Sequence, residues 1–249
     1  MGGRVVHFEI GAKDPEALHR FYAELFDWRV SVVPNAGYAL VDTTGGGGIN
    51  GGIGTSRTGA PWATFYVAVE DPQAVLEKAV SSGGRTVMPV TEIPGTITFA
   101  MFDDPDGLLV GLVRRGAEGP SAAQEPSAGA GAPVDWFEVL GSDAARTQAF
   151  YGELFGWRLE GDSSGYALVD TQAGEGAIGG GLGGVGSEGE GSRWATFYAH
   201  VSDVEAALAK AERLGGSRVY GPLAVGDHMK TGALRDPAGS VVGVYQHQH

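Results

Sequence analysis

A histidine and a glutamate lie two residues apart near the start of the chain, in Val6-His7-Phe8-Glu9-Ile10. Apolar and polar residues alternate here, which predicts a strand, and side chains two apart on a strand share a face. Imidazole titrates near neutral pH and transfers protons well beside a carboxylate. We therefore take His7 and Glu9 as the candidate catalytic acid/base pair. A polar pair satisfied inside the protein, with a structural role, is the open alternative.

An aromatic segment supplies the second set of candidates. Trp62, Thr64 and Tyr66 alternate along a predicted strand, so they share one face. Such a face suits a flat, largely apolar ligand, with the tyrosine hydroxyl fixing its orientation. Packing between two halves of a barrel needs the same aromatics and is an equal alternative.

Similar residues recur later in the chain and complete the set of substrate-binding candidates: Trp136, Glu138, Tyr198, His200 and His228. His200 follows Tyr198 on the same strand face, and we expect it to point toward Glu138. His228 lies in the polar segment Gly226–Thr231, a candidate lid. A surface histidine at a strand end and a solvated loop are the respective alternatives.

Composition excludes several kinds of function. The chain has 249 residues, no cysteine and a net charge of −13, which excludes thiolate chemistry and disfavours binding to nucleic acid or anionic membranes. No apolar run reaches the roughly 18 residues of a membrane helix. The N-terminus shows no signal-peptide core, so we expect a cytoplasmic protein. The glycine tracts Gly45–Gly48 and Gly179–Gly184 lack a phosphate-loop ending and are expected to be a mobile lid or slack in a hairpin.

The chain is a duplication. Phe21-Tyr22-Ala23-Glu24-Leu25-Phe26-Asp27-Trp28 returns as Phe150-Tyr151-Gly152-Glu153-Leu154-Phe155-Gly156-Trp157, and three further blocks return in the same order. The blocks predict one domain over residues 1–115 and a second over 134–249. Residues 116–133 are rich in Gly, Ala, Pro and Ser, which predicts an exposed linker.

Each copy reads as strand, helix and three strands, twice over. Asp14-Pro15 and Asp71-Pro72 predict helix starts, and Ser202 with Glu205 predicts a capping box before a later helix. The Asp104-Pro105-Asp106-Gly107 block predicts a β-turn rather than a carboxylate site. The whole chain is therefore an α+β protein of four βαβββ modules.

This pattern resembles the vicinal oxygen chelate superfamily, which includes glyoxalase I, bleomycin-resistance proteins and extradiol dioxygenases. The signatures are the first strand with its helix, from Val6 to Trp28, and the later Asp-Pro-x-Gly turn before an apolar strand. Both copies carry both. The resemblance implies two tandem incomplete barrels, each forming one cup, as in the two-domain branch often labelled glyoxalase-like or hydroxylase.

The resemblance also implies where a divalent metal would bind, on the first, fifth and eighth strands of a cup, usually through His or Gln, His or Glu, and Glu. The matching residues are His7, Thr64 and Gly111 in the first copy, and Trp136, Thr196 and Gly243 in the second. Threonine and glycine are not the donors that such a site needs. We therefore expect no metal and no cofactor.

These observations favour a metal-independent protein that binds a small aromatic or polyketide-like molecule. We expect a natural-product or metabolic tailoring enzyme that uses acid/base chemistry for isomerisation, elimination or cofactor-free oxidation. A non-catalytic sequestration protein of bleomycin-resistance type is the first alternative, and a metalloenzyme with displaced ligands is the second. The only expected partner is a small-molecule ligand, and the protein is a monomer or homodimer.

Overall fold

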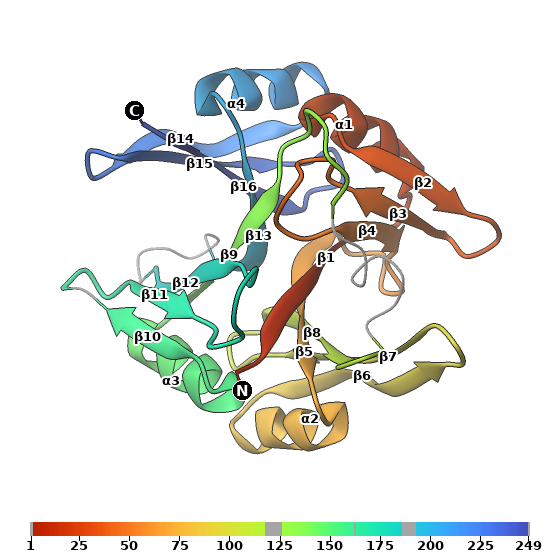
Figure 1. The fold of residues 1–249 in the computed structure, drawn as a ribbon, viewed down its shortest axis with the longest axis vertical. Helices are drawn as coiled ribbons and strands as arrows, with labels where there is room; N and C mark the ends of the chain where they lie inside the picture. Colours follow the sequence, from red (N-terminus) through yellow and green to blue (C-terminus); the bar gives the residue numbers. More distant parts are fainter. Residues whose placement is uncertain (1, 118–125, 162, 186–192, 249) are drawn as a thin grey trace. The chain divides into compact units, whose positions relative to one another are not determined.

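The computed structural model describes residues 2–117, 126–161, 163–185 and 193–248 (Figure 1). Each repeat contributes one eight-stranded sheet, with the strand orders β2-β3-β4-β1-β5-β8-β7-β6 and β10-β11-β12-β9-β13-β16-β15-β14. The elements of the first repeat are β1 (Arg4–Ala12), α1 (Glu16–Phe26), β2 (Arg29–Val33), β3 (Tyr38–Asp42), β4 (Gly51–Thr55), β5 (Trp62–Val69), α2 (Pro72–Ser81), β6 (Arg85–Ile93), β7 (Ile97–Asp103) and β8 (Leu109–Arg114). Those of the second are β9 (Val134–Gly141), α3 (Ala144–Phe155), β10 (Arg158–Gly161), β11 (Ala167–Asp170), β12 (Gly179–Gly184), β13 (Trp194–His200), α4 (Val204–Arg213), β14 (Ser217–Val225), β15 (Met229–Arg235) and β16 (Val241–His247).

The four βαβββ modules of the predicted α+β fold are confirmed. In each module the first and last strands pair in parallel, such as β1 with β4 and β5 with β8. The strands that follow the helix pair antiparallel with one another, such as β2 with β3 and β7 with β8. The register irregularities of β6 on β7 recur in β14 on β15. The two repeats therefore share their strand pairing down to the bulges.

Each sheet is built from one repeat, but each compact unit of the structure contains parts of both repeats. Unit 1 comprises the described parts of residues 1–7, 64–123 and 136–195, and unit 2 those of residues 8–63, 124–135 and 196–249. Each unit thus combines one half of each repeat. Within unit 1 α2 packs beside α3, and within unit 2 α1 packs beside α4 (Figure 1). The division into separate domains over 1–115 and 134–249 stays a prediction.

Aromatic side chains from both repeats form each unit's core. In unit 1 the rings of Phe65 and Phe137 are 4.8 Å apart, and Trp157 Nε1 donates to the carbonyl of Gly3 at 2.7 Å. In unit 2 the rings of Phe8 and Phe197 are 4.2 Å apart. Burial of such rings contributes about 2 kcal/mol or more each, so a large part of the packing energy joins the two repeats.

Helix starts follow the sequence with two differences. Asp71 caps α2 by accepting from the backbone N–H groups of Gln73 and Ala74, as predicted. The capping box predicted from Ser202 and Glu205 is wrong, because Asp203 is the N-cap and accepts from the N–H of Ala206. Helix α1 begins one residue later than predicted, after Pro15.

The tract Gly179–Gly184 is strand β12 itself, so its expected role as a lid or as slack is wrong. Glycine is required here because aromatic rings occupy the space of a side chain. A Cβ at Gly181 would lie 1.7 Å from Tyr166 Oη, and one at Gly52 in β4 would lie 1.8 Å from Tyr38 Oη. Gly45–Gly48 lies outside the strands, and its Gly46 N–H donates to the carbonyl of Ser127.

The expected exposed linker is partly wrong. Residues 118–125 lie outside the described part of the chain, but Pro126 and Gly131 are buried. Ser127 donates to the Asp42 carboxylate through its N–H at 3.0 Å and its Oγ at 2.5 Å. Trp28 Nε1 donates to the carbonyl of Ala132 at 2.8 Å. The second half of the linker is therefore held against unit 2.

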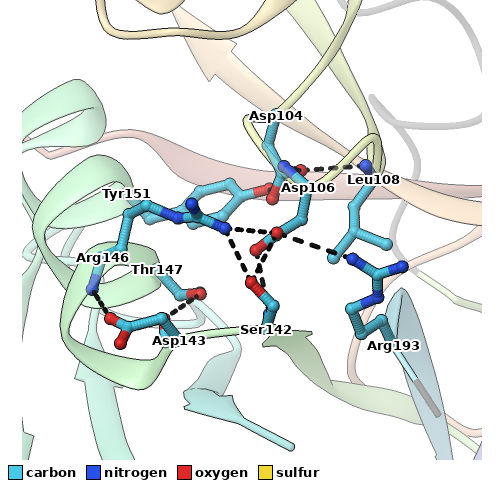
Figure 2. Close-up of polar contacts among 9 residues, drawn as sticks. All are labelled: Asp104, Asp106, Leu108, Ser142, Asp143, Arg146, Thr147, Tyr151 and Arg193. Carbon is cyan, nitrogen blue, oxygen red and sulfur yellow. Dashed lines mark hydrogen bonds and ion pairs between the residues drawn. The ribbon is translucent and has the colours of Figure 1, made fainter. Parts of the chain in front are cut away.

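A buried tyrosine–aspartate hydrogen bond joins the repeats in each unit. Tyr151 Oη donates to Asp104 Oδ2 at 3.0 Å in unit 1 (Figure 2), and Tyr22 Oη donates to Asp236 Oδ2 at 2.9 Å in unit 2. Asp104 Oδ1 accepts from the N–H groups of Asp106 and Leu108. The predicted β-turn is confirmed, and its first aspartate also anchors the helix of the other repeat.

The neighbouring Asp106 shows that the two units are not equivalent. In unit 1 its carboxylate accepts from the N–H and Oγ of Ser142, and it forms ion pairs with Arg146 and Arg193 (Figure 2). Despite partial burial, these contacts lower the pKa of Asp106. The corresponding region of unit 2 is a hollow of about 270 Å³ lined by Ala17, Pro61 and Ala238 among others.

Tyr151→Phe is expected to lower the free energy of unfolding by about 2 kcal/mol, because a buried carboxylate loses a hydrogen-bond donor. Tyr22→Phe should cost a similar amount through Asp236. Urea unfolding of Tyr151→Phe in the wild-type and Asp104→Asn backgrounds measures the coupling. Equal costs in both backgrounds would contradict a contribution from this contact.

Among the described residues, no helix is long and apolar enough to cross a membrane.

Candidate functional site

His7 lies in unit 1, on β1, with 8% of its surface exposed. Its ring meets the ring of Tyr66 edge-on, with centroids 5.7 Å apart. Burial lowers the pKa of His7 to about 4, so its imidazole is neutral at pH 7. Tyr66 Oη in turn donates to Met101 Sδ at 3.6 Å. The structure therefore brings two of the predicted residues, His7 and Tyr66, together.

The two other positions at which the resemblance implies metal ligands in the first repeat have different roles. Thr64 Oγ1 donates to the carbonyl of Leu109 at 2.5 Å, which ties β5 to β8. Gly111 pairs with Tyr66 in the sheet. A Cβ at Gly111 would lie 2.2 Å from the Tyr66 ring. The aromatic ring thus occupies the space in which a glutamate side chain would begin.

Glu9 and Trp62 belong to unit 2. Glu9 is half-buried near Tyr38, whose pKa is raised well above its usual value by burial and by the charge of Glu9. Trp62 covers Gly11, where a Cβ would lie 2.2 Å from the indole ring. The cooperation of Glu9 with His7 stays a prediction.

Glu138 is buried in unit 1, and both of its carboxylate oxygens accept hydrogen bonds. Its Oε1 accepts from Tyr166 Oη and its Oε2 from Trp194 Nε1, both at 2.8 Å. Trp136 lies beside Gly179, one strand away. Tyr166 and its counterpart Tyr38 were not among the predicted site residues. Their presence in the repeated Gly-Tyr-Ala-Leu-Val-Asp-Thr block was the available signal.

Tyr198 and His200 lie in unit 2, on β13. Tyr198 Oη is 3.2 Å from Tyr220 Oη. The ring of His200 stacks on that of Tyr245 at 4.7 Å. Its Nδ1 lies 3.9 Å from Asp135 Oδ2, so Asp135 is an acidic neighbour of His200. The expected approach of His200 to Glu138 stays a prediction. Burial lowers the pKa of His200, and the charge of Asp135 opposes this.

His228 lies at the exposed turn between β14 and β15, where its carbonyl accepts from the N–H of Gln248. The structure does not bring its side chain to Tyr198 or His200 in any described contact. A lid role for this turn stays a prediction.

The residues at the expected ligand positions do not fit a divalent metal. In the second repeat Trp136 has no donor of the required kind, Thr196 Oγ1 donates to the carbonyl of Val241 at 2.7 Å, and a Cβ at Gly243 would lie 2.3 Å from the ring of Tyr198. Imidazole or carboxylate donors are needed at such positions. In the described ranges, His, Asp and Glu form no group of three that could hold a metal ion.

Comparisons with known proteins agree with this architecture. A family model described as "Glyoxalase/Bleomycin resistance protein/Dioxygenase superfamily" matches residues 4–112, and one described as "Glyoxalase-like domain" matches residues 137–245. The chain is 28% identical to "Putative glyoxylase CFP32" of Mycobacterium tuberculosis over 95% of this chain and 92% of that protein. It is 27% identical to "Anthracycline biosynthesis protein DnrV" of Streptomyces peucetius, over 86% and 83%.

Among solved structures, homoprotocatechuate 2,3-dioxygenase of Arthrobacter globiformis superimposes with a TM-score of 0.67. The alignment covers 98% of this chain and 80% of that one at 17% identity, so this likeness concerns the fold alone. Two family matches, one to each repeat, and the relatives that span both repeats identify the chain as a member of the glyoxalase/bleomycin resistance protein/dioxygenase superfamily.

Proposed function

We propose that this protein binds a small aromatic molecule of polyketide type without a metal ion, and acts on it by acid/base chemistry. One observation carries the proposal. At Gly111 and Gly243, the ring of a neighbouring tyrosine fills the space of the expected third metal ligand. Each sheet thus offers aromatic surface and a hydroxyl group where the resemblance implies a carboxylate.

The relatives support this class of ligand. The name of the Streptomyces peucetius protein assigns it to anthracycline biosynthesis, and anthracyclines are hydroxylated aromatic polyketides. A flat ring system of this kind suits a surface of tyrosine and tryptophan rings with a few hydroxyl groups.

His7 is the proposed base. It is neutral at pH 7, so it can accept a proton from an acidic C–H or O–H group of the ligand and return it elsewhere. The ring of Tyr66 lies beside the imidazole of His7. Glu9 is the predicted acid/base partner of His7 on β1. Isomerisation, elimination and cofactor-free oxidation all begin with such a proton transfer.

Sequestration without chemistry is the second candidate. The low pKa of His7 favours it, because a base with a pKa of about 4 accepts protons weakly at neutral pH. Both functions require the aromatic surface, and only the first requires the imidazole.

His7→Ala is expected to reduce turnover by about 10²-fold or more, the usual contribution of an acid/base group, while ligand affinity changes little. Anthrone, whose ring methylene is acidic, is a suitable probe: removal of a methylene proton gives an anion that dissolved O₂ oxidises to anthraquinone with release of water, and mass spectrometry follows the conversion in air-saturated buffer. His19→Ala, on helix α1 and outside the candidate residues, is the matched control and should retain wild-type rates. Tight binding of anthrone without accelerated conversion would favour sequestration, and no binding would reject the proposed function.

A further inference from the structure

The second halves of the two repeats present equivalent sheet faces. Strands β5–β8 of unit 1 and β13–β16 of unit 2 pair in the same register, with the second set 132 residues later. In the first set Tyr66 pairs with Gly111, Gly111 with Met101 and Met101 with Met88. The same chain of pairs in the second set is Tyr198, Gly243, Ala233 and Tyr220. Each residue of the first face can therefore be compared with the residue that replaces it in the second face.

Around Tyr66 the first face carries apolar side chains, and the hydroxyl of Thr91, which pairs with Phe99, donates to the carbonyl of Pro89 at 2.9 Å. Tyr66 Oη contacts the thioether of Met101. Met88 and Phe99 lie on the neighbouring strands and are half-buried. None of these three neighbours can form a strong hydrogen bond to a ligand oxygen.

The second face carries hydroxyl groups at the matching positions. Tyr220 replaces Met88 and Thr231 replaces Phe99. Tyr220 Oη lies 3.2 Å from Tyr198 Oη and 3.1 Å from Thr231 Oγ1, which in turn contacts the carbonyl of Val244 at 3.4 Å. We call Tyr198, Tyr220 and Thr231 the hydroxyl row. Each hydroxyl can both donate and accept, so the row can adapt its protons to a ligand.

A second polar group flanks the row on β16. Tyr245 replaces Val113, stacks on His200 and donates to Asp135 Oδ1 at 2.8 Å. His247 meets the ring of His200 edge-on at 5.1 Å. Tyr220, Thr231 and Tyr245 are half-buried, and Leu223, which pairs with Thr231, is 56% exposed. This face thus combines aromatic rings, hydroxyl groups and partial access to solvent.

We propose that the hydroxyl row of the second repeat binds the phenolic or keto oxygens of the aromatic ligand, whereas the equivalent face of the first repeat does not distinguish such oxygens. This inference rests on the proposed function, because it assigns the oxygen-recognising residues for the same ligand class.

The test compares two probes, dihydroxyanthraquinone and unsubstituted anthraquinone, by quenching of tryptophan fluorescence. Wild-type protein should prefer the hydroxylated probe. Tyr220→Phe and Thr231→Val remove one hydroxyl each with little change of shape, and each should reduce that preference by about fivefold to tenfold, the worth of one hydrogen bond. Met88→Leu, at the equivalent of Tyr220, is the matched control and should keep the wild-type preference. Thermal unfolding confirms that each variant is folded.

The preference ratio separates recognition from stability, since a purely structural role would weaken both probes equally. Unchanged preference in Tyr220→Phe and Thr231→Val, with both probes still bound, would overturn the inference and leave the proposed function standing. A loss of preference in Met88→Leu alone would also overturn it, by placing recognition in the first repeat. Failure of wild-type protein to bind either probe would reject the ligand class, and the inference with it.

Discussion

Gly111→Glu is expected to destabilise the protein by about 3 kcal/mol or more, rather than to create a metal site. The substitution places a carboxylate where the resemblance implies the third metal ligand. A Cβ there would lie 2.2 Å from the Tyr66 ring, so the ring or the strand must move, and the new charge would be buried. Overpacking and burial of an unpaired charge each cost about 1–3 kcal/mol or more.

Urea unfolding measures this cost, with Thr96→Glu in an exposed turn as the control for the added charge. Tyr66→Ala combined with Gly111→Glu should recover part of the loss, because it removes the ring that the new side chain meets. Calorimetric titration with Mn²⁺ and Zn²⁺ completes the experiment. A Gly111→Glu variant that is as stable as wild type and binds either ion tightly would contradict the exclusion of a third ligand by the Tyr66 ring. Tight binding of either ion by wild-type protein would contradict the proposal of a metal-independent protein.

Acid is expected to destabilise the protein through His7 by up to about 3 kcal/mol. Burial lowers the pKa of His7 from 6.5 to about 4 in the folded protein. Between these values the unfolded chain binds the proton more readily, so stability falls as the pH falls from about 6.5 to 4. A difference of roughly 2.5 pKa units corresponds to about 3 kcal/mol. At pH 7 the imidazole is neutral in both states, and this penalty is absent.

Urea unfolding at pH 7, 5.5 and 4 should show a smaller acid-induced loss in His7→Gln than in wild type. The exposed His228→Gln should behave like wild type and is the matched control. Burial raises the pKa of Asp104, Asp135 and Asp236, and such groups favour the folded state as the pH falls, opposite to His7. Because wild type and His7→Gln share these aspartates, the difference between their pH dependences gives the contribution of His7. An identical pH dependence in His7→Gln and wild type would show that His7 does not control acid sensitivity.

The features of the candidate site that could be predicted are those that depend on residues close together in the sequence. Alternation in Val6–Ile10 predicted that His7 lies on a strand, and spacing two put Thr64 and Tyr66 on one face. The role of Glu138, held by Tyr166 and Trp194, could not be read from the sequence, because its partners lie 28 and 56 residues away. The contact of His200 with Asp135 could not be read from the sequence either, because the two residues lie on β13 and β9, far apart in the chain.

The sequence by itself determined the duplication, the four βαβββ modules and most helix and strand positions, because periodicity, capping residues and turn residues act over a few neighbours. Only the tertiary structure decided that halves of different repeats share a unit, that Tyr22 bonds Asp236, and that glycine strands make room for tyrosine rings. These outcomes depend on packing between segments up to 214 residues apart in the chain. Local sequence patterns do not show which of these distant segments pack together.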